Sequence, residues 1–310
     1  VEGDDPLLVT VPSYRPDVTR PVDLVEEVAR LADYDTFDER LRPGTGGGLT
    51  AEQRLQRRVR ELLVGLGYSQ AITLPFVMPS ELDAFDAPAD HELSRTVKVK
   101  NPLSDEEAVL RPSLLPGLLR VIRHNRSRGA SAVAVFEQGR VFHDWPWNRD
   151  KRVPDQPERL GFASVGVVGP ADLTGEGMTA DGHAAAALVR RLADGLGLRL
   201  EFHQDTAPGF HPTRMARLTS DGRFVGWVGE LHPYTARAFD VEGRVAVGEL
   251  DMEALLAARQ EPEFRPISPY PPADFDLSFE VDAELPAATL ADVIREGGGE
   301  LVERVEVFDE

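Results

Sequence analysis

The chain has 310 residues, enough for about two domains at roughly 150 residues each. Acidic residues outnumber basic ones 53 to 34, and the formal net charge of −19 counts against a surface dominated by nucleic-acid or polybasic membrane contacts, although not against a local basic patch. The absence of cysteine excludes disulfides, cysteine-ligated metals and thiol nucleophiles, no apolar run approaches the roughly 20 residues of a membrane helix, and no signal peptide opens the chain.

The first forty residues predict a strand followed by an amphipathic helix. The strand covers residues 7–11, and the helix covers 23–33, with Asp23 as its cap and Glu26 three residues on, as in a capping box. Because almost nothing precedes the strand, we expect the chain to begin inside a domain.

Residues 42–49 are rich in glycine and predict a flexible linker. The alternative is a phosphate-binding loop, but the segment lacks the Lys-Ser/Thr ending and no clear strand leads into it.

The middle of the chain mixes helices with long strands. A helix over 50–66 begins with Thr50 as cap and Gln53 at the third position, and Asp221-Gly222 predicts a tight hairpin. Strands are predicted at 69–77, 132–136, 139–143, 160–168, 198–203, 214–219, 223–230 and 244–250, and helices at 113–124 and 183–195. This order indicates an α+β fold rather than alternating βαβ units.

After an acidic linker at 257–267, the last part of the chain predicts a β-α-β unit. Its strands cover 275–282 and 301–308, and its helix covers 287–296. This is half of a ferredoxin-like domain, so we expect the chain also to end inside a domain.

Three groups of segments, in register over nearly the whole chain, resemble the β subunit of bacterial phenylalanyl-tRNA synthetase. They lie at 12–17 with 22–31, at 101–104 with 110–119 and 136–142, and at 210–216 with 229–233 and 248–251. The resemblance implies an α+β fold with a class II synthetase-like antiparallel sheet and flanking helices. It divides the chain into the end of a B5 domain (1–38), a non-catalytic B6–B7 core (39–256), a linker (257–267) and the first part of a ferredoxin-like anticodon-binding B8 domain (268–310).

The same resemblance implies a function. The family's complex uses ATP to attach phenylalanine to tRNA(Phe), with ATP and catalysis on the α subunit, in a cytoplasmic (αβ)₂ heterotetramer without membrane contact. The β subunit is then structural, binding the α subunit and tRNA. Two other functions stay open, a free-standing class II-like binding module and a Mg²⁺-dependent hydrolase.

Four carboxylates near the N-terminus form the candidate metal site. Asp23, Glu26 and Glu27 share one helix face, and Asp17 approaches from the preceding loop. Converging carboxylates repel unless a cation neutralises them, and oxygen ligands suit Mg²⁺. The alternative is that these residues cap the helix and favour its positive N-terminus. The resemblance implies Mg²⁺ ligands at all four positions, in a site that the α subunit helps to complete.

Two further segments resemble elements of class II synthetases. Residues 65–75 resemble motif 1, a helix and strand that build the subunit interface, although an ordinary helix–strand unit fits equally well. Of the two arginines that hold ATP in active enzymes, His143 stands at the motif 2 position, and the stretch matching motif 3, 247–256, contains none. Because charge on the triphosphate would not be stabilised, we expect no catalytic residues in this chain.

The helix predicted at 113–124 leads into a basic stretch that stands out in an acidic chain. Its arginines, together with His124, predict contacts with tRNA phosphates or with an acidic partner, and a solvated helix face is the alternative. These arginines are Arg120, Arg123, Arg126 and Arg128. His211 and His232 each precede a proline and are expected to be structural rather than catalytic.

Overall fold

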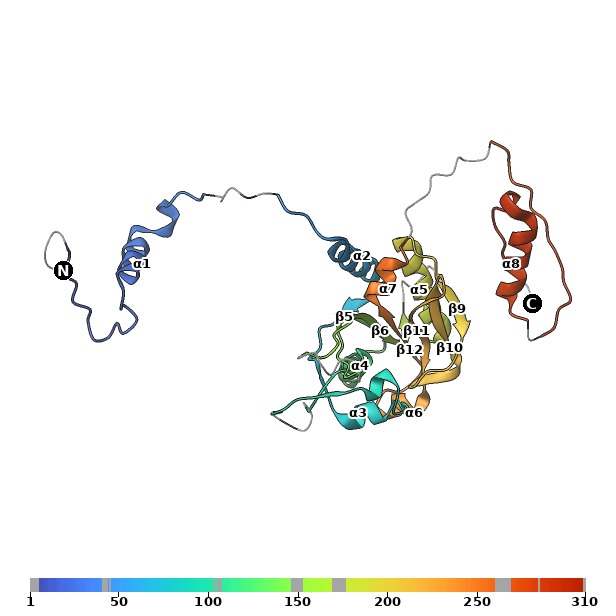
Figure 1. The fold of residues 1–310 in the computed structure, drawn as a ribbon, viewed down its shortest axis with the longest axis horizontal. Coiled ribbons are helices and arrows are strands. Elements are labelled where there is room, and N and C mark those ends of the chain that lie inside the picture. Colours follow the sequence, from blue (N-terminus) through green and yellow to red (C-terminus); the bar gives the residue numbers. More distant parts are fainter. Residues whose placement is uncertain are drawn as a thin grey trace. The chain divides into compact units, whose positions relative to one another are not determined.

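A computed structural model describes residues 6–40, 44, 46–102, 104, 108–145, 153–168, 177–259, 269–283 and 285–308. The chain divides into two compact units, Val1–Gln260 and Glu261–Glu310, which are described separately (Figure 1). Within the described ranges, no helix has the length and apolar character needed to cross a membrane.

A seven-stranded sheet forms the centre of the first unit (Figure 1). β1 runs parallel to β5, and every other neighbouring pair is antiparallel, so the sheet is mixed rather than purely antiparallel as predicted. In spatial order its strands are β1 (Ser69–Gln70), β5 (Val133–Arg140), β6 (Glu158–Val165), β12 (Val245–Asp251), β11 (Arg223–Leu231), β10 (Phe210–Ser220) and β9 (Glu201–Gln204). The predicted α+β class is confirmed.

Helices cover both faces of this sheet. On one face lie α2 (Ala51–Gly65), α5 (Gly182–Leu196) and α7 (Met252–Ala257), which share a hydrophobic core with the sheet. On the other face α4 (Leu115–Ser127) packs on β5 and β6 and forms a second hydrophobic core with them. Residues of α6 (Pro233–Ala238) belong to this second core as well. The sheet is therefore buried on both sides by apolar side chains.

Shorter elements complete the first unit. The three-stranded sheet of β2 (Phe76–Val77), β4 (Val109–Leu110) and β3 (Val97–Lys98) adjoins α3 (Pro79–Asp83) in the chain, and β7 (Val167–Val168) pairs with β8 (Met178–Thr179). A 3-10 turn lies at Glu92–Ser94.

Local sequence signals set several boundaries as predicted. The Thr50 side chain accepts a hydrogen bond from the Gln53 amide while the Gln53 side chain accepts one from Thr50, which confirms the capping box of α2. Asp221 and Gly222 both have positive φ, as a two-residue hairpin turn between β10 and β11 requires.

The two strands predicted at 132–136 and 139–143 are in fact one strand, β5. The pairing with β6 continues through Gly139, which lies opposite Arg159. A Cβ at this glycine would come 2.5 Å from Nη2 of Arg111. Gly139 therefore makes room for a buried guanidinium group and does not mark a turn.

The N-terminal segment contains the helix α1 (Pro21–Ala32), followed by a 3-10 turn at Tyr34–Thr36. The helix starts two residues earlier than predicted because Pro21 has no N–H and suits the first turn, which puts Asp23 at the third position instead of the cap. The strand predicted at 7–11 is wrong, since residues 6–11 contain no more than a single bridge position.

The second unit contains α8 (Ala287–Gly298) and a 3-10 turn at Gly299–Leu301. Neither of its predicted strands forms among residues 269–283 and 285–308. A strand is stable only when its backbone groups are paired, and the described residues of this unit form no sheet with which it could pair. The predicted linker at 257–267 falls mostly outside the described residues, whereas residues 44 and 46–49 of the linker predicted at 42–49 are described and lie in neither a helix nor a strand.

Candidate functional site

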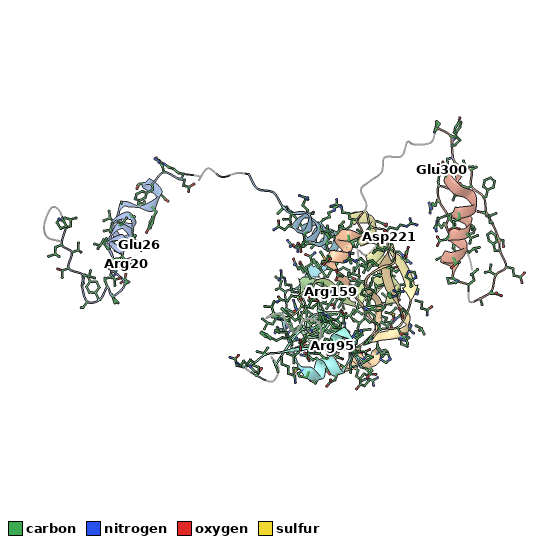
Figure 2. All side chains as sticks on the ribbon, viewed as in Figure 1. Arg20, Glu26, Arg95, Arg159, Asp221 and Glu300 are labelled. Atoms are coloured by element: carbon green, nitrogen blue, oxygen red, sulfur yellow. The ribbon has the colours of Figure 1, made fainter. Side chains whose placement is uncertain are left out.

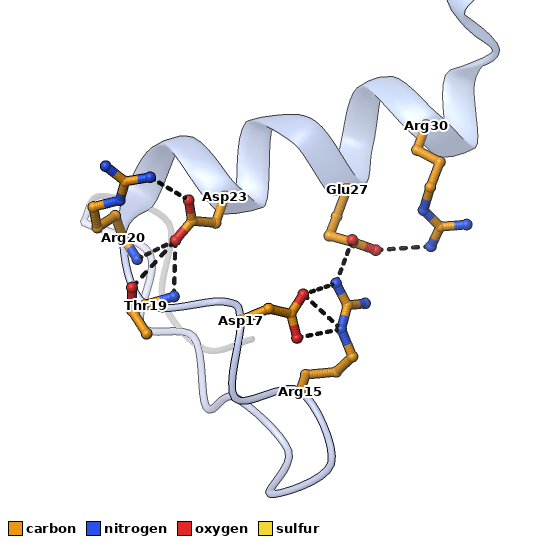
Figure 3. Close-up of polar contacts among 7 residues, drawn as sticks. All are labelled: Arg15, Asp17, Thr19, Arg20, Asp23, Glu27 and Arg30. Atoms are coloured by element: carbon orange, nitrogen blue, oxygen red, sulfur yellow. Dashed lines mark hydrogen bonds and ion pairs between the residues drawn. The ribbon is translucent and has the colours of Figure 1, made fainter. Parts of the chain in front are cut away.

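Arg15 joins two of the four predicted carboxylates (Figure 3). Its Nη2 atom lies 2.6 Å from Oδ2 of Asp17 and 2.6 Å from Oε1 of Glu27. The other oxygen of Glu27 accepts a hydrogen bond from Arg30 at 2.7 Å. The hydrogen bonds from Arg15 and Arg30 lower the pKa of Glu27 to about 2, and Arg15 also lowers the pKa of Asp17.

Asp23 serves the start of α1 instead. Its Oδ2 atom accepts hydrogen bonds from the amides of Thr19 at 2.8 Å and Arg20 at 2.7 Å, which lower its pKa (Figure 3). Glu26, labelled on the same helix in Figure 2, makes no side-chain hydrogen bond or ion pair within the described part of the chain.

These positions do not form a metal-ligand set as they stand. Nowhere in the described residues do three or more His, Asp or Glu side chains come together in a way that could hold a metal ion. Asp17, Asp23 and Glu27 are each paired with an arginine, and Asp23 also accepts hydrogen bonds from two backbone amides at the start of α1. The magnesium site therefore stays a prediction. The sequence analysis missed Arg15 and Arg30, although an arginine two residues before Asp17 and another three after Glu27 signal ion pairing.

The basic stretch on α4 divides into structural and free arginines. Arg120 donates to the Phe76 carbonyl at 2.7 Å and pairs with Glu81 at 3.4 Å. Arg126 donates to the carbonyls of Ala130 and Ser131. Their guanidinium groups are thus engaged in holding the fold.

The remaining basic residues are Arg123, His124 and Arg128. Arg123 makes only a long ion pair of 3.9 Å with Asp240 among the described residues. The side chain of Arg128 makes no hydrogen bond or ion pair with any of them. A groove of about 920 Å³ lies here, and its lining includes Arg123 and His124 together with the acidic residues Asp240 and Glu242. Only part of the predicted basic surface is available to a ligand.

An apolar edge lies beside β1. From residue 71 to 75 the extended chain alternates, with Thr73 pointing inward while Ile72 and Leu74 are 89% and 67% exposed. Val64 on α2 is also exposed. The opposite edge strand, β9, has the sequence Glu-Phe-His-Gln and is mostly polar. Exposed apolar edges favour association with another protein, whereas polar edges resist it. The edge beside β1 is therefore the one suited to a protein contact.

Arg111 and Glu137 form a buried ion pair behind this edge. Nη1 of Arg111 lies 2.8 Å from Oε1 of Glu137, and both side chains are buried. Thr73 joins them, donating to Glu137 at 2.7 Å and accepting from Arg111 at 2.9 Å. The pair connects the 71–75 segment to β5.

The face of the sheet beside this pair is filled by α4. A Cβ at Gly161 would lie 2.8 Å from Cβ of Leu114, so the helix approaches the middle of β6 closely. Glu249 on β12 accepts hydrogen bonds from Ser113 Oγ at 2.5 Å and from the Leu114 amide at 3.0 Å. The carboxylate thereby fixes the start of α4.

His143 lies in the same region and is 1% exposed. Neither ring nitrogen has a hydrogen-bond partner among the described residues, and burial lowers the pKa of the imidazole. A neutral imidazole supplies no fixed positive charge. The nearby Arg159, labelled in Figure 2, pairs with Glu92 and Asp251 instead.

His211 and His232 have local roles, as expected. Nδ1 of His211 accepts from the Thr213 amide, and Nδ1 of His232 accepts from the Tyr234 amide at the start of α6. Their rings lie 6.4 Å apart. His232 thus caps the start of α6, and His211 makes a local contact near the start of β10.

Two comparisons, with family models and with curated relatives, give the same family. The family model described as phenylalanyl tRNA synthetase beta chain CLM domain matches residues 41–252, and the tRNA synthetase B5 domain matches residues 1–34. The phenylalanine–tRNA ligase beta subunit of Streptomyces avermitilis is 38% identical, covering 100% of this chain and 40% of the relative. The same subunit from Moorella thermoacetica is 38% identical (100% and 38% covered), and that from Bacillus subtilis is 36% identical (99% and 38% covered).

The chain thus spans 38–40% of the length of these relatives. Among solved structures, a pyrrolysyl tRNA synthetase from Desulfitobacterium hafniense is 14% identical with a TM-score of 0.49, covering 66% of this chain and 64% of that one.

The environment of Glu249 predicts a pH-dependent stability. Burial raises its pKa to about 7, above the usual 4.5, so the folded state holds a proton that the unfolded state has lost. The stability that this proton contributes is complete below pH 4.5 and is lost as pH rises toward about 7. The free energy of unfolding changes by about 3 kcal/mol over this range. We expect Glu249→Gln to remove this dependence in urea unfolding followed by tryptophan fluorescence at about pH 5 and pH 8. Glu253→Gln, an exposed control on α7, should leave it intact. Equal pH dependence in the Glu249 variant and the parent chain would contradict the assignment.

Proposed function

This chain belongs to the phenylalanyl-tRNA synthetase beta-chain family, and we propose that it works as the structural part of the complex that joins phenylalanine to tRNA(Phe) with ATP. The family resemblance drawn from the motifs is thereby confirmed. Catalysis and ATP binding are assigned to the α subunit, in a cytoplasmic (αβ)₂ assembly. The proposed division of the chain keeps residues 39–256 as a class II-like core between the end of a B5 domain and the start of a ferredoxin-like domain.

The exposed edge beside β1 carries this proposal. Ile72 and Leu74 project from an extended segment whose other side is fixed by Thr73 through Arg111 and Glu137. Two exposed aliphatic side chains on a rigid backbone favour a stable protein contact. The segment belongs to the stretch that resembles motif 1, and we assign it to the α-subunit interface.

The filled face of the sheet supports a non-catalytic role. Leu114 occupies space against Gly161, and His143 is a neutral, buried side chain at the position that resembles the motif 2 arginine. Arg159, which reaches Asp251 at the end of the motif 3-like strand, is held by Glu92 and Asp251. The guanidinium groups of Arg111 and Arg159 are thus engaged by acceptors within the chain and are not free to stabilise a triphosphate.

Contact with tRNA is assigned to Arg123 and Arg128. Their guanidinium groups are the least engaged of the four predicted arginines. Phosphate contacts of this kind position RNA without reading its sequence.

The magnesium site at Asp17, Asp23, Glu26 and Glu27 remains part of the proposal for the assembled complex, and no chemical step is assigned to it. A free-standing binding module would share the filled face but would not need the apolar edge. A Mg²⁺-dependent hydrolase is less favoured because arginines, and no gathered ligand set, surround these carboxylates in the described chain.

Association with a cognate α subunit tests the assignment directly. We expect the chain to copurify with that subunit, and Ile72→Asp with Leu74→Asp to abolish copurification because a charge in an apolar contact is desolvated without a partner. Tyr234→Asp, an exposed aromatic on α6, is the matched control and should copurify normally. Failure of the parent chain to associate would contradict the function, and normal association of the double variant would contradict the interface.

The chain alone should form no phenylalanyl-adenylate. Phenylalanine-dependent pyrophosphate exchange measures this step, and the expected signal is that of the buffer. Exchange that depends on the chain and on phenylalanine would show that the core is catalytic.

Replacing Arg123 and Arg128 with alanine should weaken tRNA(Phe) binding and lower the slope of log K against log salt by about two. The control pair, Arg191→Ala with Arg199→Ala, removes the same charge from the opposite face of the sheet. Arg191 lies on α5, and Arg199 lies in the segment that follows it. Equal losses in the two double variants would reduce the effect to net charge and contradict a specific contact.

A further inference from the structure

The groove beside α4 is lined by groups of both charges. Arg123 and His124 come from the second half of the helix, and Asp240 and Glu242 come from the loop between α6 and β12. Its volume of about 920 Å³ lies within the range of about 300–1,000 Å³ that is typical of ligand pockets. The groove is thus large enough for a small polar ligand or for one unit of a polymer.

The two segments that line the groove are anchored in the same hydrophobic core. Ile122, the residue before Arg123, is fully buried, and Val241, between the two acidic residues, is 4% exposed. The Val241 amide also donates a hydrogen bond to the Ala236 carbonyl at 2.9 Å. Because their backbone is held in this way, Asp240 and Glu242 present exposed carboxylates from a fixed position.

The two carboxylates differ in how they are engaged. Nη1 of Arg123 lies 3.9 Å from Oδ2 of Asp240, so this carboxylate already faces a cation. The Glu242 side chain makes no hydrogen bond or ion pair with any residue that the structure describes. The groove therefore combines a weakly held guanidinium group with a free carboxylate, and it suits a ligand that carries both an anionic group and N–H donors.

A nucleotide of single-stranded RNA has this combination of groups. Its phosphate is anionic, and its unpaired base can be hydrogen-bonded on the Watson–Crick edge and stacked on a ring such as that of His124. An acidic protein partner fits less well, because its carboxylates would meet Asp240 and Glu242 and repel them.

The free carboxylate discriminates among the four bases. The Watson–Crick edge of guanine presents adjacent N–H donors at N1 and N2, which match the two acceptor oxygens of a carboxylate. Uracil instead places carbonyl oxygens on both sides of a single N–H, and these oxygens repel a carboxylate. Attraction to one base and repulsion of another together give specificity.

We propose that Glu242 is a specificity-determining residue that binds the Watson–Crick edge of an unpaired guanine in RNA, while Arg123 binds a phosphate of the same strand. This inference rests on the proposed tRNA contact of Arg123 and names the base that the same groove recognises. Asp240 acts as a positioning residue, since its ion pair with Arg123 holds the guanidinium group at the groove.

Four labelled pentanucleotides that differ only in the central base, UUGUU, UUAUU, UUCUU and UUUUU, test the preference. Each is titrated with the full chain at constant salt and followed by fluorescence anisotropy. The parent chain should bind UUGUU at least about fivefold more tightly than UUUUU, the lower end of what a bidentate base contact contributes. Glu242→Gln should bind UUGUU and UUUUU about equally, and its retained affinity for UUUUU would show that the variant is folded.

Two further variants separate base recognition from charge. Removing an acidic group from a chain of this net charge should, by charge alone, tighten the binding of every RNA. Glu253→Gln, the matched control, loses the same charge from α7 on the other face of the sheet and should keep the guanine preference. Arg123→Ala should weaken all four RNAs by a similar factor, because a phosphate contact does not read the base.

The results that would overturn the inference are distinct from those that bear on the tRNA contact. Equal affinity of the parent chain for all four RNAs, or a guanine preference that survives in Glu242→Gln, contradicts base recognition and leaves the contact of Arg123 standing. Absence of binding to every RNA contradicts both. Association with the α subunit is not involved in any of these measurements, so that part of the proposed function is tested separately.

Discussion

The buried ion pair between Arg111 and Glu137 is the contact on which the exposed edge of the sheet depends. Arg111 also donates from Nε to the Arg140 carbonyl, and its backbone bonds to Pro75 and Phe142. The residue thereby joins the extended edge, the end of β5 and the approach to α4. Removing one partner of such a pair leaves a buried charge uncompensated and costs about 3–5 kcal/mol. The inward side of the edge is consequently fixed, and the outward side presents its aliphatic side chains on a rigid backbone.

The same region shows how a sheet of this kind loses an open face. Gly139 leaves space for the Arg111 guanidinium group, and Gly161 leaves space for Leu114. Both glycines let α4 and its preceding segment approach the strands, with Glu249 holding the start of the helix. A ligand on this face would have to replace packed leucine side chains, and close-packed interiors do not yield such space cheaply. This face of the sheet can therefore either support α4 or bind a ligand, but it cannot do both.

The sequence predicted those parts of the fold whose causes are local. The α2 cap needs only Thr50 and Gln53, and the β10–β11 hairpin needs only Asp221 and Gly222. Elements whose causes lie elsewhere in the chain were missed. Gly139 is explained only by Arg111, twenty-eight residues away in the sequence, and the strands expected in the second unit need pairing partners that local patterns do not reveal.

The candidate site follows the same division. Sequence spacing located the carboxylates of α1 on one helix, but it left open what neutralises them. The answer depends on how the loop carrying Arg15 folds back on Glu27, which helical periodicity does not determine. Spacing likewise located four arginines on one stretch of chain, and the contacts of Arg126 with the carbonyls after the helix separate its role from that of Arg123.

The arginines discussed above mainly bind carboxylates and carbonyls of this same chain. In a chain with a net charge of −19, Arg15, Arg111 and Arg126 all bind carboxylates or carbonyls within the chain. An arginine already engaged by two acceptors must lose them before it contacts a phosphate, so it contributes less to external binding than its charge suggests. The number of basic residues in a stretch is thus a poor measure of its affinity for RNA. The relevant quantity is how many of those guanidinium groups lack an internal acceptor, and on α4 that condition selects the outer turn near Arg123 and not the whole helix.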